Sequence, residues 1–331
     1  MDPLLTPLHQ VLDRVDSRLL APESDVRIWS TGFPLLDDAL GGGLRAGALN
    51  LLAGSQGEGK TTFALQIARS VAGSGRPVLF FSFELEAEAL LQKVIAAEAA
   101  DLGVESPISV YQVRAAFEGT DEMTGGLLER LGRYPGGADA LERVAGYAPS
   151  MLIHRSTTTH TNLDVIAASV KDVLSEVGEP PLVVVDYLQK VRPGQQLDEE
   201  AAVTQVTERL KDIAIEFECP VLAISASDRA GLEPGMRMRA RNMKGSTALA
   251  YEADVVLILA NKADIVARHH LMYSANNGEH FKTWSVLTVE KNRSGRTGAE
   301  VEFRKDFASG RFLSDGHVVS EKLVDERVFT E

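Results

Sequence analysis

The chain contains 331 residues, 44% of them hydrophobic and 24% charged, and its formal net charge is −13. This length allows one large α/β domain, or such a domain with a small appendage, and no low-complexity or Pro/Gly/Ser-rich tract divides it, so we expect one folded unit. The acidic balance excludes a protein that coats nucleic acid over its whole surface, so any nucleic-acid contact must be local.

The N-terminal segment predicts a helix rather than a targeting signal. Residues 1–20 mix acidic and apolar side chains and lack the basic start and apolar run of a signal peptide. No segment approaches the run of about 20 apolar residues that crosses a bilayer, so we expect a cytoplasmic protein without membrane contact. The apolar spacing predicts an amphipathic helix and a connector over residues 1–27, packed on its own domain or on a neighbouring subunit. The residues at this spacing are Leu5, Leu8, Leu12, Val15 and Leu19.

From about residue 28, short apolar runs alternate with longer helical patterns. Strands that are apolar throughout, separated by helices, predict a mostly parallel, doubly wound α/β sheet covered on both faces. After Ala253 the pattern changes, and turn signals at Asn277-Gly278 and around Gly295 predict that the sheet ends in antiparallel hairpins. The predicted parallel strands are residues 48–54, 76–84, 149–156, 180–188 and 220–227, and the predicted helices are residues 60–72, 86–100, 162–178 and 202–218.

A phosphate-binding motif follows the first of these strands. The stretch GSQGEGKT, residues 54–61, matches the pattern G-x-x-x-x-G-K-[ST] in full and opens a predicted helix. Its glycines let backbone N–H groups turn toward phosphate oxygens, and the helix N-terminus adds partial positive charge. A glycine-rich turn that only caps a helix is the alternative, but the complete motif in this context favours nucleotide binding.

The motif predicts ATP and Mg²⁺ as ligands. Lys60 would reach the β- and γ-phosphates, and Thr61 would ligate Mg²⁺. Glu58 falls at a variable position where the backbone does the binding, so its side chain need not touch a phosphate. The predicted nucleotide-binding residues are Gly54, Ser55, Gln56, Gly57, Glu58, Gly59, Lys60, Thr61 and Thr62.

Two carboxylates at strand ends suit hydrolysis of the nucleotide. Asp186 ends the apolar run PPLVVVD, at the edge where doubly wound sheets bind ligands, and would hold Mg²⁺ beside Thr61. Glu84 ends VLFFSFE and would orient and deprotonate the attacking water. Each has a plainer interpretation, because Asp186 could be a turn residue and Glu84 an acid favoured by the dipole of the following helix.

Three motifs resemble the replicative helicases of the DnaB family, whose motor is a RecA-like P-loop ATPase. They are GEGKTTFALQIA with the later FSFELEAEALLQK, then VVVDYLQKVRP, then LKDIAIEFECPVLAIS, and the similarity covers roughly residues 28–313. The resemblance implies a RecA-like domain over residues 28–316, preceded by the helix and linker of residues 1–27 and followed by a tail, residues 317–331. It also implies an ATP-hydrolysing helicase that acts on single-stranded DNA as a homo-hexameric ring.

The resemblance also implies roles for individual residues. In VEKNRSG, Lys291 and Arg293 would reach the γ-phosphate of a neighbouring subunit, an arginine finger in trans worth about 10³ to 10⁵ in rate. Composition alone would instead make these two residues part of a solvated hairpin loop. By position, the nucleotide-hydrolysis set is Lys60, Thr61, Glu84 and Asp186.

A basic cluster lies in DRAGLEPGMRMRARNMKGST, which contains one internal acid, Glu233. Cations on a glycine-bounded loop suit a nucleic-acid backbone, and in the family the corresponding loop faces the channel of the ring. No aromatic residue is interleaved, so the contact would be mainly electrostatic, and a solvated loop is the alternative. The cluster comprises Arg229, Arg237, Arg239, Arg241 and Lys244, of which the last four are the predicted DNA contacts.

The chain departs from the family pattern in three places. About 27 residues precede the motor, where the helicases carry a collar domain that recruits primase, which makes primase recruitment doubtful. Ala226 in AISASDR replaces a Gln that can sense the γ-phosphate in the family, so coupling of hydrolysis to loop movement could be weakened or rerouted. The residues ARNMK before Gly245 and Ser246 also differ, so DNA contacts cannot be assigned one by one.

Two other functions stay open at this point. The KNR sequence also resembles recombination or accessory ATPases of the RecA and RadA type, although no zinc-binding cysteines support the full RadA arrangement. A KaiC-like nucleotide-dependent switch or assembly module without DNA unwinding would account for Ala226 and for the acidic balance. Stimulation of ATP hydrolysis by single-stranded DNA would favour the motor over the switch.

Overall fold

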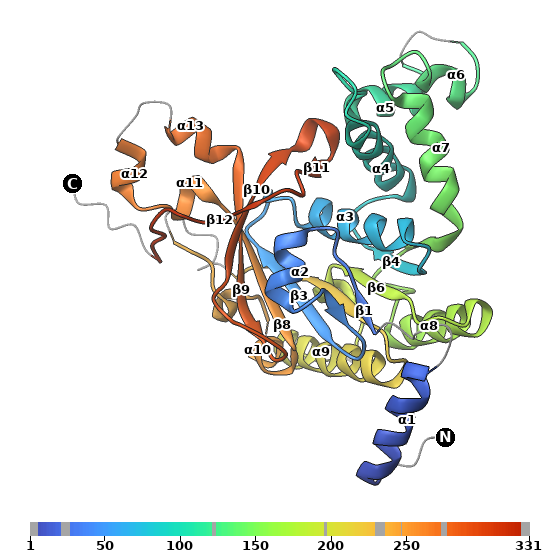
Figure 1. Ribbon diagram of the computed structural model, residues 1–331, viewed down its shortest axis with the longest axis vertical. Helices are drawn as coiled ribbons and strands as arrows, with labels where there is room; N and C mark the ends of the chain where they lie inside the picture. Colours follow the sequence, from blue (N-terminus) through green and yellow to red (C-terminus); the bar gives the residue numbers. More distant parts are fainter. Residues whose placement is uncertain are drawn as a thin grey trace.

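The computed structural model describes residues 6–20, 27–120, 124–194, 197–228, 236–245, 247–272 and 277–325, and Arg229 of the predicted basic cluster lies outside these ranges. The strands of its main sheet are β3 (Leu49–Gly54), β4 (Val78–Ser82), β5 (Met151–Arg155), β6 (Leu182–Asp186), β7 (Val221–Ser225), β8 (Val255–Asn261), β9 (Trp284–Asn292), β10 (Glu300–Asp306), β11 (Arg311–Phe312) and β12 (His317–Val318). Within the described ranges they form one ten-stranded sheet in the order β11-β10-β9-β8-β3-β7-β6-β4-β5, with β12 paired to β10 (Figure 1).

Strands β3 to β8 pair in parallel, and β9 to β12 are joined to the sheet by antiparallel pairing. The parallel strands are buried on both faces, because Val184 packs into one core while Val183 and Val185 pack into the other. This two-sided burial explains why these strands are apolar throughout. The predicted fold class is confirmed, including the antiparallel pair of β9 and β10 around Gly295.

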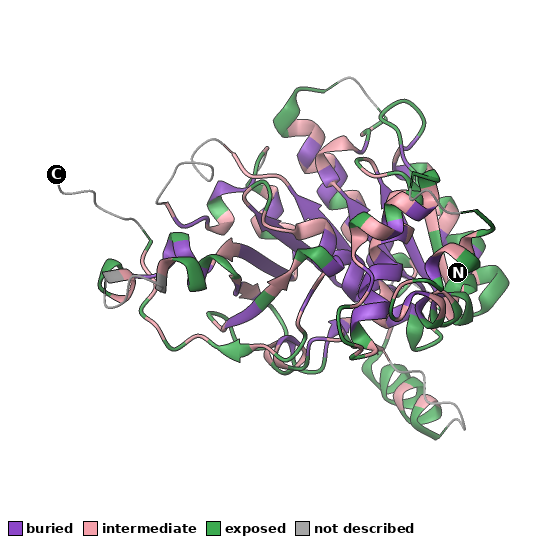
Figure 2. Cartoon of the chain, turned by 90° about the horizontal axis from the view of Figure 1, so that it is seen from above, coloured by how far each residue is buried: buried purple, intermediate pink, exposed green. Residues whose placement is uncertain are grey.

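Helices cover both faces of the sheet. On one face lie α2 (Pro34–Leu40), α3 (Lys60–Gly73) and α4 (Ala87–Asp101), and on the other lie α8 (Leu163–Val177), α9 (Glu199–Glu216) and α10 (Ala248–Glu252). A short pair of strands, β1 (Ile28–Trp29) and β2 (Leu44–Arg45), flanks α2. Figure 2 shows that buried residues concentrate in the sheet and in the helix faces turned toward it. Because the central strands run parallel, their carboxyl ends lie together at one edge of the sheet, between the two layers of helices.

Residues 102–148 carry no predicted element, yet they fold into helices over α4. These are α5 (Val110–Glu118), α6 (Leu127–Leu131) and α7 (Gly137–Tyr147). Ser109 caps α5 by accepting a hydrogen bond from the backbone N–H of Gln112, whose side chain accepts one from the Ser109 N–H in return. This S-x-x-Q capping box is a signal in the sequence that could have located the start of α5.

The hairpin turn predicted at Asn277-Gly278 is wrong, because a helix begins there. Buried Ala263, Val266 and Phe281 form a small hydrophobic core of their own in this region. The segment between β8 and β9 is therefore a packed helical insertion rather than a tight turn. Its helices are α11 (Lys262–Ile265), α12 (Arg268–Met272) and α13 (Asn277–Lys282).

The predicted N-terminal helix is present as α1 (Leu8–Leu20), and Figure 1 shows it projecting away from the sheet. None of its residues is buried, and the helix is coloured as exposed and intermediate in Figure 2. Leu8, Leu12 and Leu19 are exposed. Packing of this helix on its own domain, one of the two predicted arrangements, is therefore not observed among the described residues. No helix in the described ranges combines the length and the apolar character required to cross a membrane.

Residues 317–325, the described part of the predicted tail, contact the rest of the chain. Val318 pairs with Val301 in the contact between β12 and β10. The backbone N–H of Val324 donates a 2.8 Å hydrogen bond to the carbonyl oxygen of Ile265. The first part of the predicted tail is thus in contact with β10 and with the segment after β8, and residues 326–331 lie outside the described ranges.

Candidate nucleotide site

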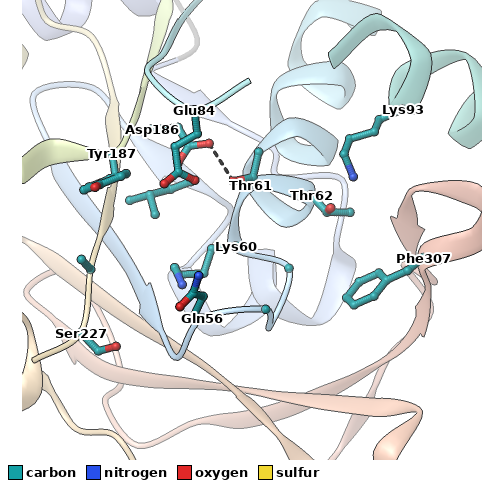
Figure 3. Close-up of a pocket in the computed structure, with 14 residues that line it drawn as sticks. Gln56, Lys60, Thr61, Thr62, Glu84, Lys93, Asp186, Tyr187, Ser227 and Phe307 are labelled. Atoms are coloured by element: carbon teal, nitrogen blue, oxygen red, sulfur yellow. Dashed lines mark hydrogen bonds between the residues drawn. The ribbon is translucent and has the colours of Figure 1, made fainter. Parts of the chain in front are cut away.

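A cavity of about 550 Å³ opens at the carboxyl ends of the parallel strands (Figure 3). Its walls come from the loop after β3, the start of α3, and the residues that follow β4, β6 and β7. Gly54, Ser55 and Glu58 of the predicted phosphate motif do not line this cavity. The motif residues that do are Gln56, Gly57, Gly59, Lys60, Thr61 and Thr62.

The loop needs its glycines for conformation and for close packing. Gly57 and Gly59 have φ angles of 85° and 87°, in the left-handed region that favours glycine. A Cβ atom on Gly59 would lie 2.7 Å from Cζ of Phe307, and one on Gly54 would lie 2.3 Å from the carbonyl oxygen of Leu259. Substitution at any of these positions would therefore distort the loop that opens α3.

Lys60 turns its ammonium group back into this loop. Its Nζ donates 2.9 Å hydrogen bonds to the carbonyl oxygens of Gly54 and Ser55. Burial lowers the pKa of Lys60, and the carboxylates of Asp186 and Glu84 oppose that effect. A phosphate oxygen is a stronger partner for an ammonium group than a neutral carbonyl, so the side chain is ready to exchange these bonds for an anion.

Thr61 and Asp186 meet across the cavity, from the start of α3 and the end of β6. The hydroxyl of Thr61 donates a 2.7 Å hydrogen bond to Oδ2 of Asp186, which is 1% exposed. Burial raises the pKa of Asp186 to about 6, with Glu84 adding to the rise while the Thr61 hydrogen bond and Lys60 oppose it. Hydroxyl and carboxylate oxygens are the ligands that Mg²⁺ accepts, so this donor set fits the predicted metal.

Glu84 lies two residues beyond the end of β4 and lines the same cavity, near Asp186 (Figure 3). The turn that carries it is held on both sides: Ser82 Oγ accepts a 3.2 Å hydrogen bond from the Leu85 N–H, and the Phe83 N–H donates one of 2.8 Å to the Asp186 carbonyl oxygen. The structure therefore brings Glu84, Asp186, Thr61 and Lys60 together, as predicted, although their roles stay predictions.

Two further side chains at the opposite end of the cavity were not predicted. Lys93 of α4 and Phe307 both line it near Thr62 (Figure 3). Burial, reinforced by the charge of Arg114, lowers the pKa of Lys93. The Phe307 ring is 42% exposed and makes an edge contact with Phe312. Lys93 could have been noticed in the sequence, because it is a charged residue within the largely buried stretch of α4. No local sequence feature indicated that Phe307 lines the cavity.

Glu58 turns away from the cavity, as its variable position in the motif suggested. Its Oε2 lies 3.9 Å from Nζ of Lys305 on β10. Burial raises the pKa of Glu58, and the Lys305 charge opposes the rise. The carboxylate of Glu58 therefore faces β10 and not the cavity, and binding of nucleotide through the Glu58 backbone stays a prediction.

Comparison with known proteins assigns the family. A family model described as the DnaB-like helicase C terminal domain matches residues 29–312. The chain belongs to this family. The resemblance seen in the sequence is thereby confirmed, and it accounts for the P-loop and the two strand-end carboxylates in one arrangement.

Individual DnaB relatives are distant in sequence. The chain is 27% identical over 274 residues to a probable replicative DNA helicase of Trieres chinensis and 27% identical over 285 residues to the replicative DNA helicase DnaB of Pasteurella multocida. These matches cover 81% and 84% of this chain but 53% and 54% of the relatives, so the chain spans about half their length. A solved DnaB-like replicative helicase has a TM-score of 0.71 at 18% identity, covering 94% of this chain and 68% of that chain, and this likeness supports the fold.

The two residues predicted as a finger in this DnaB-like domain lie far from its own P-loop. Lys291 pairs with Val256 at the amino end of β8, whereas Gly54 pairs with Leu259 nearer the carboxyl end. Lys291 Nζ donates hydrogen bonds of 2.8 and 2.9 Å to the carbonyl oxygens of Ala250 and Tyr251. Arg293 forms a 3.3 Å ion pair with Asp254. Neither side chain lines the cavity of its own chain, so a finger role would have to be in trans.

The basic cluster is divided by the fold, and the side chain of Arg237, one of the predicted DNA contacts, is turned into the domain. The side chain of Arg237 is 5% exposed, forms an ion pair with Glu300 and donates a 2.8 Å hydrogen bond to Thr288. Arg239 pairs with Glu290 and Asp325. Arg237 is buried and Arg239 is partly exposed, but both guanidinium groups are bound by carboxylates of the same chain and are therefore less available to a DNA phosphate.

Arg241 and Lys244 are the exposed members of the described cluster. Lys244 forms a 2.7 Å ion pair with Glu199, and both side chains of this pair are largely exposed. Such a surface pair is weak and can exchange for another anion. Ala226, the departure from the family pattern, lines the cavity beside Ser227.

Proposed function

We propose that this DnaB-like domain hydrolyses ATP and drives movement along single-stranded DNA as a ring of six copies. The observation that carries this proposal is the hydrogen bond between Thr61 and Asp186 at the P-loop, with Glu84 at the same cavity. It joins a phosphate motif, a metal-binding pair and a candidate base in one site. Membership of the DnaB-like helicase family also supports this proposal.

Each residue of the cavity has a part in hydrolysis. The loop of residues 54–59 and the N-terminus of α3 would hold the phosphates, and Lys60 would leave its loop carbonyls to bind the β- and γ-phosphates. Thr61 and Asp186 would hold Mg²⁺, which when bound neutralises charge on the phosphate oxygens. Glu84 would orient the attacking water and accept its proton as the new bond to the γ-phosphorus forms, while the bond from that phosphorus to the β–γ bridging oxygen breaks and ADP leaves.

Assembly of several copies would complete the site. Lys291 and Arg293 lie at the opposite edge of the sheet from the P-loop, so they can act only on the nucleotide of another copy. The apolar side of α1, including Leu8 and Leu12, is exposed and would be covered by a neighbour. Both features support the ring, in which each finger supplies positive charge to the adjacent γ-phosphate.

A second candidate function is a nucleotide-dependent switch that does not unwind DNA. Ala226 favours it, because a methyl group at the cavity cannot donate a hydrogen bond to a γ-phosphate. Contact with DNA would in that case be weak or absent. The recombination alternative has less support, because the family model that matches describes helicases.

The deciding experiment measures ATP hydrolysis with and without single-stranded DNA at low salt, using the wild-type chain and Glu84→Gln. We expect DNA to stimulate the wild type, and we expect Glu84→Gln to lower the rate by about 10² to 10⁴ while nucleotide binding persists. Glu86→Gln is the matched control, because Glu86 pairs with exposed Arg155. Absence of both DNA binding and DNA stimulation would reject the motor and favour the switch.

A further inference from the structure

Gln189 occupies a junction between three parts of the domain. It lies in the short helix η2 (Leu188–Lys190), three residues beyond Asp186. Its Oε1 accepts a 3.1 Å hydrogen bond from the backbone N–H of Ala226. Its Nε2 donates bonds of 3.0 Å to Ser225 Oγ and 2.9 Å to the carbonyl oxygen of Lys244. One amide thus joins the end of β6, the end of β7 and the basic cluster.

The end of β7 is also joined to the basic cluster through the main chain. The Lys244 N–H donates a 2.8 Å hydrogen bond to the Ala226 carbonyl oxygen, and the Asp228 N–H donates one of 2.8 Å to that of Asn242. Between them, Ser227 and Met243 form an isolated antiparallel bridge. Residues 226–228 and residues 242–244 therefore form a short ladder that Gln189 closes at one end.

The same residues meet the nucleotide cavity. Ala226 and Ser227 line it, whereas Gln189 and Lys244 do not. A displacement of the backbone at Ala226 must therefore also move its hydrogen-bond partners, the Gln189 amide and the Lys244 N–H. Because Ala226 has no polar side chain, the backbone and the Gln189 amide are the polar groups through which this position can signal.

We propose that Gln189 is a positioning residue that transmits the nucleotide state of the cavity to Arg241 and Lys244. The proposal rests on the proposed function for the identity of the nucleotide. When the end of β6 at Asp186 moves, the Gln189 amide passes this movement to residues 241–245, which include Lys244. A glutamine suits this junction because one planar group supplies an acceptor and two donors at the same time.

A purely structural role would have a different signature. A side chain that only holds the ladder together would change the exchange of its amides equally in every nucleotide state. A transmitting side chain would instead change the difference between nucleotide states. Hydrogen–deuterium exchange of peptides that contain residues 240–250 reads this difference directly, because the Lys244 amide is a member of the ladder.

The experiment compares exchange in these peptides with Mg²⁺-ADP and with Mg²⁺-ATPγS. The chains are wild type, Gln189→Leu and the isosteric Gln189→Glu, which keeps the acceptor for the Ala226 N–H but loses the donors. Gln205→Leu is the matched control, because the Gln205 Oε1 is buried and has no hydrogen-bond partner among the residues that the structure describes. Binding of ATPγS, measured by calorimetry, should persist in every variant, since Gln189 does not line the cavity.

In the wild type and in Gln205→Leu, we expect the exchange rate of these peptides to differ at least threefold, roughly, between the ADP and the ATPγS state. In both Gln189 variants we expect this difference between the two states to be lost. The proposal is overturned if a Gln189 variant keeps it, or if the wild type has none. Binding of a labelled oligo-dT, followed in parallel, tests the proposed function separately. Failure of DNA binding would reject the motor, while the exchange data would still decide the role of Gln189.

Discussion

The Thr61 hydroxyl donates a 2.7 Å hydrogen bond to the carboxylate of Asp186, a residue 125 positions away in the sequence. The two meet because a P-loop helix and the end of a parallel strand share one edge of the sheet. Asp186 is 1% exposed, so burial disfavours its charge, and a cation at this position would restore the ionised form. The contact therefore predicts how the site depends on magnesium.

We expect Asp186→Asn to raise the Mg²⁺ concentration needed for half-maximal ATP hydrolysis by at least about 10- to 100-fold. The amide keeps the shape of the side chain but loses the negative charge that would attract the ion. Removal of Mg²⁺ with EDTA should abolish hydrolysis by the wild type. Asp172→Asn, at an exposed position on α8, is the control and should titrate like the wild type. An unchanged Mg²⁺ requirement in Asp186→Asn would remove this residue from the metal site.

The opposite end of the cavity predicts where the base of the nucleotide binds. The Phe307 ring is half-exposed there, and stacking of a base on an aromatic ring contributes about 1 to 3 kcal/mol. We expect Phe307→Ala to raise the KM for ATP about tenfold with little change in kcat, as measured by steady-state kinetics. Tyr111→Ala removes an exposed aromatic side chain outside the cavity and should leave the KM unchanged. Weaker binding of tripolyphosphate by Phe307→Ala would contradict a role confined to the base.

Residues around this site show what can be predicted from sequence and what cannot. The P-loop was predictable because its local backbone conformation requires glycine at set positions. Asp186 was predictable because parallel strands have their carboxyl ends at one edge of the sheet. Lys93 and Phe307 were not, because they approach the cavity from α4 and from the turn after β10. Their proximity depends on packing between elements that no spacing rule relates.

Arg237 and Arg239 show the same limit more sharply. In the sequence they are cations in a basic loop, but their partners Glu300, Glu290 and Asp325 lie between 51 and 86 residues further along the chain. Counting charges within one segment cannot detect acids that the fold brings to it from elsewhere. The described cluster therefore leaves Arg241 and Lys244 for contact with a ligand.

The double variant Arg241→Ala with Lys244→Ala should weaken binding of single-stranded DNA in a salt-dependent way. The plot of log affinity against log salt has a negative slope, and each lost phosphate contact makes that slope shallower by about 0.7. Fluorescence anisotropy of labelled oligo-dT across a salt series measures both quantities. The charge-matched control is Arg133→Ala with Lys171→Ala, at exposed positions away from the cavity. Equal loss of affinity in both double variants would show that net charge, and not this segment, attracts DNA.

Complementation between two inactive chains should reveal the finger in trans. Arg293→Ala should lower ATP hydrolysis by about 10³ to 10⁵, because it removes a positive charge from the transition state on a neighbour. Lys60→Ala chains cannot bind the phosphates but keep the finger. Mixing the two should restore activity at interfaces where an intact finger meets an intact P-loop. Arg296→Ala, in the same exposed turn, should behave like the wild type. Mixtures that stay inactive would argue against a finger supplied by a neighbour.

The helical insertion between β8 and β9 contains a buried cation whose removal should destabilise the fold. Lys262 is 3% exposed, and its ammonium group lies 2.6 Å from the Glu302 carboxylate and 2.7 Å from that of Glu321. Lys262→Met would leave these acids without their partner. Because breaking a buried ion pair costs about 3 to 5 kcal/mol, we expect the free energy of unfolding in urea at pH 7 to fall by that amount.

The loss caused by Lys262→Met should shrink in acid. Burial alone would raise the pKa of Glu321, but hydrogen bonding and charge from Lys262 hold it below its ordinary value of 4.5. A carboxyl whose pKa is lowered in the folded state stabilises above its ordinary pKa, and that contribution is lost as the pH falls through the lowered value. Urea unfolding at pH 7 and at pH 4 should therefore give a smaller difference at pH 4. Lys282→Met, which breaks an exposed pair with Glu279, should match the wild type at both, and a pH-independent loss for Lys262→Met would instead indicate a packing defect.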